Sequence, residues 1–278
     1  MGNISPRLDR VLVSIDFGDS SLSTARWVAN HFAPEAEIIL AHVIEPPPAT
    51  RSEIIRYPSM ETIVNKAHFE VEARLTELCK SIAPDRSQAE IRVGTPHDEL
   101  VLLSRNLGAD IIVVGREDLG SSGWARIGAT AQRVLRKSSV PILLVTGAHE
   151  QAPQRLLVAV DQSDMTDDVV TWGAYLAGRF SATVTAVHAA GPESPGDDEA
   201  WMTEQLSGVS STVAMQKRVT RSSVRPAESI IAEARSLESE LVVIGSRGAG
   251  AANQLLFGSV AESVLLSSPC PVLVVLPS

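Results

Sequence analysis

The chain is poor in cysteine: Cys79 and Cys270 are the only two among its 278 residues. Two thiols cannot form the disulfide framework that stabilises small secreted domains, so the simplest location is a reducing cytoplasm. The sequence also lacks any apolar run near the ~20 residues of a membrane span, and its N-terminus has no secretory apolar segment. Positive charge is in deficit too: 24 lysines and arginines stand against 33 aspartates and glutamates, which gives a net charge of −9. That balance argues against a general partner of nucleic acid or of anionic membranes.

Signatures of several enzyme classes are missing as well. The sequence contains no G-x-S-x-G elbow, no Walker A lysine and no H-E-x-x-H helix. Its histidines show no paired metal-ligand spacing, and we interpret them as structural or adjacent to a ligand. We therefore assign no catalytic residue and expect no metal site from protein motifs, although slow chemistry on a bound ligand stays open.

The chain contains an internal repeat: one sequence pattern occurs twice. The matched landmarks, in a single order, are Asp16 and Asp161, Trp27 and Trp172, His42 and His188, Pro96 and Pro226, Gly115 and Gly245, Gly128 and Gly258, and Val140 and Cys270. Their spacing falls from 145 residues (161 − 16) to 130 (245 − 115), so the second copy is shorter before Pro226. We predict two modules, residues 1–148 and 149–278, with a lip or loop replacing a long helix in the second. Trp27 and Trp172 are predicted to pack in the core or between the modules.

Each copy alternates strands and helices. In the first we predict strands near 9–15, 36–44, 89–94, 110–115 and 141–146, and helices near 19–33, 58–83, 96–108 and 128–138. In the second we predict strands near 155–161, 182–189, 213–221, 240–245 and 271–276, with a short helix around 201–206. Continuously apolar strands such as 111–114 are typical of sheets covered on both faces. The alternation therefore predicts an α/β fold, with a parallel, doubly wound sheet in each module.

The most informative motif lies near the C-terminus. Gly245 and Gly248 follow an apolar strand, and Gly258 and Ser259 open a helix. Gly245 lets a ligand approach the main chain, Gly248 permits a positive φ, and free N–H groups at a helix start attract an anion. The plainer alternative is that these are ordinary turn glycines and that Ser259 begins a capping box. Arg247 either reaches a phosphate or is solvated.

Asp161 ends the first strand of the second copy. At a carboxyl strand end, its carboxylate can accept hydrogen bonds from a ribose hydroxyl or an adenine amine, or can hold a metal ion. The alternative is an N-cap for a helix starting near Asp164.

In combination, G-x2-G-x9-G-S, the strand-end aspartate and the entry Ser268-Pro269-Cys270-Pro271 to the last strand resemble the universal stress protein family, in its tandem-domain form. The resemblance covers nearly the whole chain, twice. It implies two Rossmann-like modules (adenine nucleotide alpha hydrolase-like), each with five parallel strands, that pair through their last strands. It also implies binding of ATP or another adenine nucleotide, with Mg²⁺ as an accompanying ion. The residues implicated are Asp161, Ala189, Ile244, Gly245, Ser246, Arg247, Gly248, Gly258, Ser259 and Val260.

The first copy departs from this motif. Asp16, Val43, Gly115 and Gly128 are kept, but Asp118 replaces the second glycine and Ala129 replaces the serine. A carboxylate ~4 Å from a phosphate costs about 1–4 kcal/mol, so we predict a degenerate site with weak or no nucleotide binding. A nucleoside-sized ligand stays open there.

We expect a stress-response or signalling protein that binds adenine nucleotide in its C-terminal module. A slow ATPase and a nucleotide-independent interaction module are the alternatives. Intramolecular pairing of the modules and a homodimer both remain open.

Overall fold

The structure, a computed structural model, describes residues 5–46, 59–116, 128–191, 197–209, 213–248 and 257–277. The first module consists of β1 (Arg10–Ser14), α1 (Asp19–Trp27), the single π-helical turn η1 (Val28–Phe32), β2 (Glu37–Ile44), α3 (Ser59–Ile82), β3 (Ser87–Val93), α4 (Pro96–Leu107), β4 (Ile111–Arg116), α5 (Ala129–Lys137) and β5 (Ile142–Thr146). The second consists of β6 (Arg155–Val160), α6 (Thr166–Phe180), β7 (Thr183–Ala190), α7 (Asp198–Val209), β8 (Met215–Arg221), α8 (Pro226–Ser236), β9 (Leu241–Gly245), α9 (Ser259–Ser267) and β10 (Val272–Val275). All the predicted strands are present.

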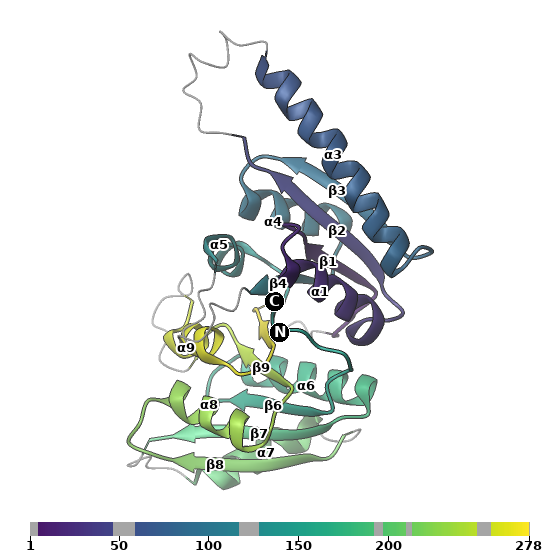
Figure 1. Cartoon of the computed structure of the whole chain (residues 1–278). Coiled ribbons are helices and arrows are strands. Elements are labelled where there is room, and N and C mark those ends of the chain that lie inside the picture. Colours follow the sequence, from purple (N-terminus) through teal and green to yellow (C-terminus); the bar gives the residue numbers. More distant parts are fainter. Residues whose placement is uncertain are drawn as a thin grey trace.

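The two modules share one sheet. Its ten strands run in the order β3-β2-β1-β4-β5-β10-β9-β6-β7-β8 (Figure 1). Pairing is parallel within each module, whereas β5 and β10 pair antiparallel, with Leu273 opposite Leu143. In both modules the strand order reverses beside the first strand, between β1 and β4 and between β6 and β9. Such reversals open a crevice at the carboxyl ends of the strands, where ligands of α/β sheets bind.

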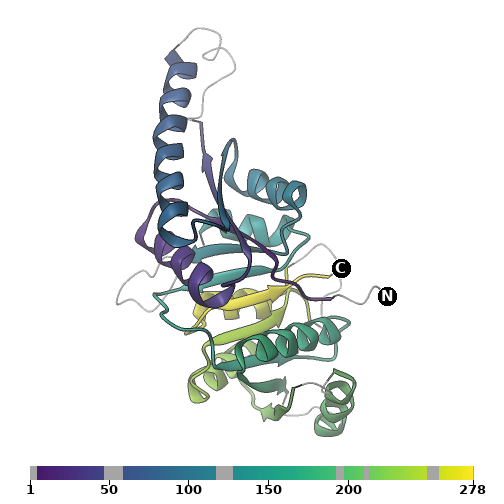
Figure 2. The ribbon, with the colours of Figure 1, turned by 90° about the vertical axis from the view of Figure 1, so that its right-hand side faces the viewer.

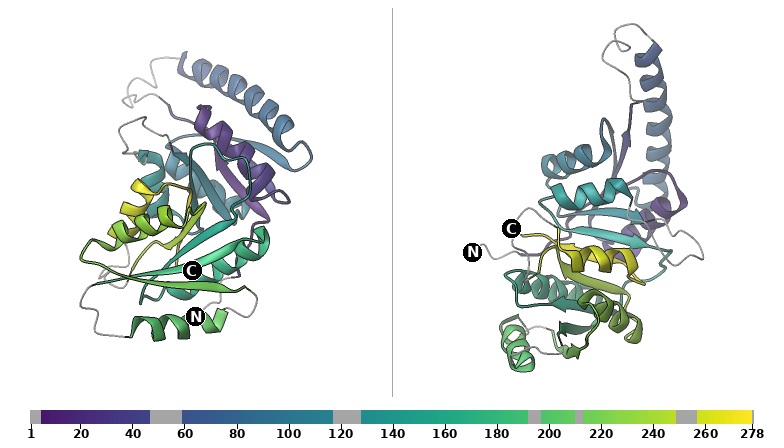
Figure 3. Two further views of the ribbon diagram at one scale, coloured as in Figure 1. Left: turned by 60° about the horizontal axis from the view of Figure 1, so that its bottom comes forward. Right: turned by 90° about the vertical axis from the view of Figure 1, so that its left-hand side faces the viewer.

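Helices cover both faces of this sheet. Apolar residues of α1, α3, α6 and α7 form one buried layer, and those of α4, α5, α8 and α9 form the other. Each layer runs across both modules without a break at the β5–β10 seam. Figure 3 shows α5 and α9 side by side on one face. The predicted α/β class, with two tandem doubly wound modules, is confirmed.

Contacts outside the sheet also join the two modules. The rings of Phe32 and Phe180, one from each module, lie 5.4 Å apart. The Trp27 indole Nε1 donates to the Gln151 carbonyl over 2.8 Å. Trp172 is buried as well, so the matched tryptophans pack inside the protein as predicted.

The short helix predicted around residues 201–206 is present and is longer than predicted, since α7 spans Asp198–Val209. The prediction of a lip or loop is wrong for that part of the segment. Asp198 in its first turn is fully buried, 2.9 Å from Arg221 Nη1 and 3.7 Å from His188 Nε2. Met202 and Leu206, four residues apart, are also buried against the sheet. A buried carboxylate requires a compensating partner, and Arg221 of β8 supplies the positive charge. The first turn of α7, which lies outside the predicted 201–206, therefore depends on tertiary contacts that no local pattern reveals.

The long helix α3 is only partly packed. Leu75, Leu78 and Ile82 are buried, whereas Ala67 and Val71 earlier in the predicted apolar stripe are half-exposed. The first half of α3 consequently extends beyond the strands (Figures 1 and 2).

Both cysteines are buried and free of disulfides. Burial raises the pKa of the Cys270 thiol to about 11, so this thiol is protonated at neutral pH and a poor nucleophile. None of the described helices combines the length and apolar character needed to cross a bilayer.

Candidate functional site

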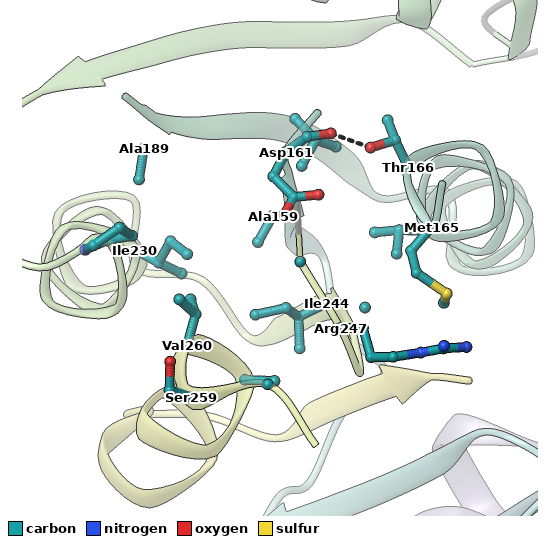
Figure 4. Close-up of a pocket in the computed structure, with 17 residues that line it drawn as sticks. Ala159, Asp161, Met165, Thr166, Ala189, Ile230, Ile244, Arg247, Ser259 and Val260 are labelled. Carbon is teal, nitrogen blue, oxygen red and sulfur yellow. Dashed lines mark hydrogen bonds between the residues drawn. The ribbon is translucent and has the colours of Figure 1, made fainter. Parts of the chain in front are cut away.

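A cavity of about 360 Å³ opens at the carboxyl edge of the second module, where β6 and β9 diverge. Figure 4 shows that β6, β7 and β9 form its floor and that α6, α8 and α9 surround it. The residues that line it are Ala159, Val160, Asp161, Met165, Thr166, Val169, Ala189, Pro226, Ile230, Ile244, Gly245, Arg247, Gly248, Gly258, Ser259, Val260 and Ala261. Nine of the ten predicted binding residues are in this set. The tenth, Ser246, is buried, and its N–H donates to the Val275 carbonyl over 2.8 Å.

Asp161 lies at the end of β6, at the edge of this cavity. Its Oδ1 accepts hydrogen bonds from the Ser163 hydroxyl at 2.5 Å and the Ser163 N–H at 3.2 Å. The Thr166 hydroxyl donates to its main-chain carbonyl. The N-cap of α6 is Met165, so the alternative role of Asp161 as a helix cap is wrong. Ser163 instead holds the carboxylate at the strand end.

Gly248 is required for space rather than for its backbone angle. A Cβ built there would lie 2.6 Å from Asp161 Oδ2. Its φ is not in the positive range in which glycine is favoured, which corrects the predicted reason for this glycine. The loop thus brings the bare main chain of Gly248 up against the carboxylate of Asp161.

Gly258 fixes the start of α9. Its N–H donates to the Ser246 carbonyl over 2.8 Å, and a Cβ would lie 3.2 Å from that oxygen. Gly258 is the N-cap of α9, and no side chain caps the helix. The alternative in which Ser259 begins a capping box is therefore wrong. Ser259 is exposed in the first turn, where unpaired N–H groups carry about half a positive charge.

The remaining walls of the cavity are apolar. Ile230 from α8, Ile244 from β9 and Val260 from α9 face the space below Ala189 (Figure 4). Pro226 and Ile230 were missed in the sequence because apolar residues that line a cavity look like ordinary core residues. Arg247 extends beneath Met165 and away from Ser259 (Figure 4). The site therefore combines an apolar slot, a carboxylate and a helix N-terminus.

The first module has a cavity of about 440 Å³ at the matched place. Its lining residues are Ser14, Ile15, Asp16, His42, Val43, Pro96, Leu100, Val114, Gly115, Gly128, Thr130 and Ala131. Asp16 Oδ1 accepts hydrogen bonds from the Ser21 hydroxyl at 2.6 Å and the Gly18 N–H at 2.8 Å. Ala129 begins α5 but is not in the lining, and Asp118 lies outside the described residues.

The matched histidines have matched contacts. His42 Nδ1 lies 2.6 Å from the Ile15 carbonyl, and His188 Nδ1 lies 2.9 Å from the Val160 carbonyl. Each ring thus ties the second strand of its module to the first, close to the strand-end aspartate. In the part of the chain that the structure describes, no three histidine, cysteine or acidic residues are grouped to hold a metal ion.

The two helix-capping glycines provide a matched test. Gly258→Ala is expected to lower the free energy of unfolding by about 1 kcal/mol, because the new methyl group meets backbone atoms of Ser246 and Arg247. No described atom lies within 4 Å of a Cβ at Gly128, so Gly128→Ala is expected to lose only the N-cap preference for glycine over alanine and to cost less than Gly258→Ala. Urea unfolding of both variants measures the difference. Equal losses in both would contradict the close packing at Gly258.

The fold and the cavities define a tandem pair of Rossmann-like modules, each with a ligand-sized crevice at its strand ends. The model of the universal stress protein family matches residues 7–146 and 153–275. The chain belongs to that family, in its tandem form.

Known relatives share this arrangement along their whole length. A universal stress protein from Mycolicibacterium smegmatis is 27% identical over 296 residues, covering 96% of this chain and 97% of the relative. Universal stress protein Rv2623 from Mycobacterium tuberculosis is 28% identical over 297 residues, covering 95% of each. The crystal structure of a universal stress protein from Archaeoglobus fulgidus matches with a TM-score of 0.76 and 20% identity, covering 98% of this chain and 100% of the other.

Proposed function

We propose that the C-terminal module binds ATP or a related adenine nucleotide as part of a stress-response or signalling protein. The observation that carries the proposal is the meeting of Asp161, Gly248 and the start of α9 around one cavity. A volume of about 360 Å³ is within the usual range for small-ligand sites.

The parts of a nucleotide match the three parts of this site. The apolar slot of Ile230, Ile244 and Val260 suits a flat base, which gains from leaving water. The Asp161 carboxylate, held by Ser163, suits the hydroxyls of a ribose. The unpaired N–H groups at the start of α9 and the Ser259 hydroxyl suit phosphates. Any Mg²⁺ would bind chiefly to phosphate oxygens and water.

The first module is proposed to bind nucleotide weakly or not at all. Asp16 is held by Ser21 and Gly18 much as Asp161 is held by Ser163. The difference is that Ala129 has no hydroxyl to offer a phosphate and that Asp118 replaces the second motif glycine. Among the described residues that line the second cavity, the only carboxylate is Asp161, which is placed for a ribose rather than for activating water. We therefore propose a binding protein rather than an efficient ATPase, with a conformational or partner-binding output.

Other parts of the proposal concern organisation. Modules 1–148 and 149–278 are proposed to act as an intramolecular pair in the cytoplasm. Association into a homodimer would have to use surfaces other than the β5–β10 seam, because that seam is already filled within the chain.

Native mass spectrometry of the full chain with Mg-ATP tests the function. We expect one adenine nucleotide per chain, and none in Asp161→Ala, whose apolar slot and helix N-terminus are intact. Two nucleotides per wild-type chain would show that the first module also binds. No uptake at saturating ATP would overturn the proposal and favour a nucleotide-independent interaction module.

Two further variants separate the alternatives. Asp118→Gly combined with Ala129→Ser restores the motif residues of the first copy and is expected to raise the stoichiometry toward two. Multiple-turnover phosphate release that disappears in Ser259→Ala would favour the slow ATPase instead.

A further inference from the structure

Arg116 is a buried arginine of the first module that donates hydrogen bonds to the second. It ends β4, next to Gly115 in the first cavity, and only 6% of its surface is exposed. Its guanidinium donates from Nη1 to the Leu265 carbonyl and from Nη2 to the Ser268 carbonyl at 3.2 Å. Both acceptors lie at the C-terminal end of α9. An arginine of the first module thus caps the helix whose other end opens the second cavity.

The sequence of α9 explains why it needs an external donor. In an α-helix the Leu265 carbonyl would accept from the N–H of residue 269, but residue 269 is proline and has none. The helix, described throughout, has no basic residue in its last turn. The matched helix α5 carries Arg136 and Lys137 in its own last turn. Arg116 therefore supplies α9 with both the missing donor and the missing positive charge.

The position of Arg116 is itself fixed. Its main chain pairs with Thr146 of β5, and its carbonyl accepts a hydrogen bond from the Ser20 hydroxyl at 3.0 Å. At the other end of α9, the Gly258 N–H donates to the Ser246 carbonyl, and Ala261 is buried in the core. The helix is nine residues long, so it is about 13 Å from end to end. A shift at its C-terminal end therefore moves the N–H groups that face the cavity.

We propose that Arg116 is a positioning residue for the nucleotide site of the other module. It holds α9 so that the N–H groups of Ser259 and Val260 point at the phosphates. The inference rests on the proposed function, and it assigns the first module a part in binding that does not require a ligand of its own. The matched residue of the second module is Ser246, whose short side chain cannot extend to a helix of the first module. The second module therefore depends on Arg116 of the first, with no matching dependence in the other direction.

Arg116→Met removes the donors and the charge while keeping an unbranched apolar stem. We expect its affinity for Mg-ATP to fall about threefold to thirtyfold, because helix-end charge effects are of this size. Its affinity for adenosine, which has no phosphate, is expected to change less than about threefold. Isothermal titration of both ligands gives the ratio, which general destabilisation would not alter. Equal losses for the two ligands would overturn the proposal.

Hydrogen exchange of the ligand-free protein provides the second measurement. We expect the α9 amides of Arg116→Met to exchange about tenfold faster while those of α5 stay unchanged. Arg105→Met is the matched control, because Arg105 Nη2 donates to the Lys137 carbonyl at the end of α5 over 3.2 Å. This variant is expected to loosen α5 and to leave both α9 and ATP affinity unchanged.

Arg116→Lys covers the case in which Arg116→Met does not fold. It keeps the charge but cannot donate to the Leu265 and Ser268 carbonyls in the same bidentate geometry, so an intermediate loss of ATP affinity is expected. Unchanged exchange in α9 of either Arg116 variant would show that Arg116 does not hold the helix. If wild-type protein binds no ATP, the proposed function fails, while the exchange data still decide whether Arg116 fixes α9.

Discussion

Gly248→Asp is expected to weaken nucleotide binding by about tenfold to thousandfold. The new Cβ would start 2.6 Å from Asp161 Oδ2, so the two side chains cannot both keep their places. The substitution also adds a negative charge where the phosphates of the ligand are expected. A carboxylate ~4 Å from a phosphate of the ligand repels it by about 1–4 kcal/mol, depending on the local screening, and this sets the expected loss in affinity. Titration of the variant with Mg-ATP measures the loss.

Two control variants separate charge from space. Gly248→Ala introduces the Cβ without the carboxylate and is expected to weaken binding less than Gly248→Asp does. Gly178→Asp adds the same charge on the exposed side of α6, where no described atom lies within 4 Å of a Cβ, and should leave affinity unchanged. Wild-type affinity in Gly248→Asp would show that this loop does not contact the ligand.

Leu273→Ala is expected to lower the free energy of unfolding by about 2–5 kcal/mol, as removal of a buried leucine does. Leu273 is fully buried in β10, opposite Leu143 of β5, where the two modules join. Because both buried layers are continuous across this seam, the loss should spread to both modules. Native-state hydrogen exchange of β2 and β7 measures it in each module separately.

Leu102→Ala is the matched control, since Leu102 is 51% exposed on α4 and its truncation should change stability by less than about 0.5 kcal/mol. Faster exchange in β7 with unchanged exchange in β2 would contradict the prediction. It would mean that the modules unfold independently despite their common sheet.

The central strands were predictable from the sequence because each is a short apolar run, whereas the edge strands β3 and β8 are largely polar. The repeat supplied every strand twice. The helix α7 was underestimated for a physical reason. Its first turn is held by the contacts of Asp198 with Arg221 and His188, which lie on two neighbouring strands rather than on the helix itself. No 3.6-residue periodicity reports such contacts.

Part of the candidate site could also be predicted from the sequence, and part could not. Asp161, Gly245 and Gly258 could be assigned to one place because the carboxyl ends of parallel strands share an edge. The apolar wall could not, since Ile230 has the same local pattern as any core isoleucine of α8. Arg116 was missed because its acceptor, Leu265, is 149 residues away. Its only sequence signal is Pro269, which leaves a carbonyl without its usual donor.

The antiparallel β5–β10 seam has a consequence for how this protein can diverge. When two identical chains meet about a two-fold axis, any substitution enters the contact twice and must be compatible with itself. Here both halves are encoded in one chain, so each side of the contact can change alone. Arg116 and Ser246 occupy corresponding positions and differ, and only the arginine reaches across. Duplication within one chain thus permits an asymmetric interface, in which one module can evolve to stabilise the other and the second can evolve to bind a ligand.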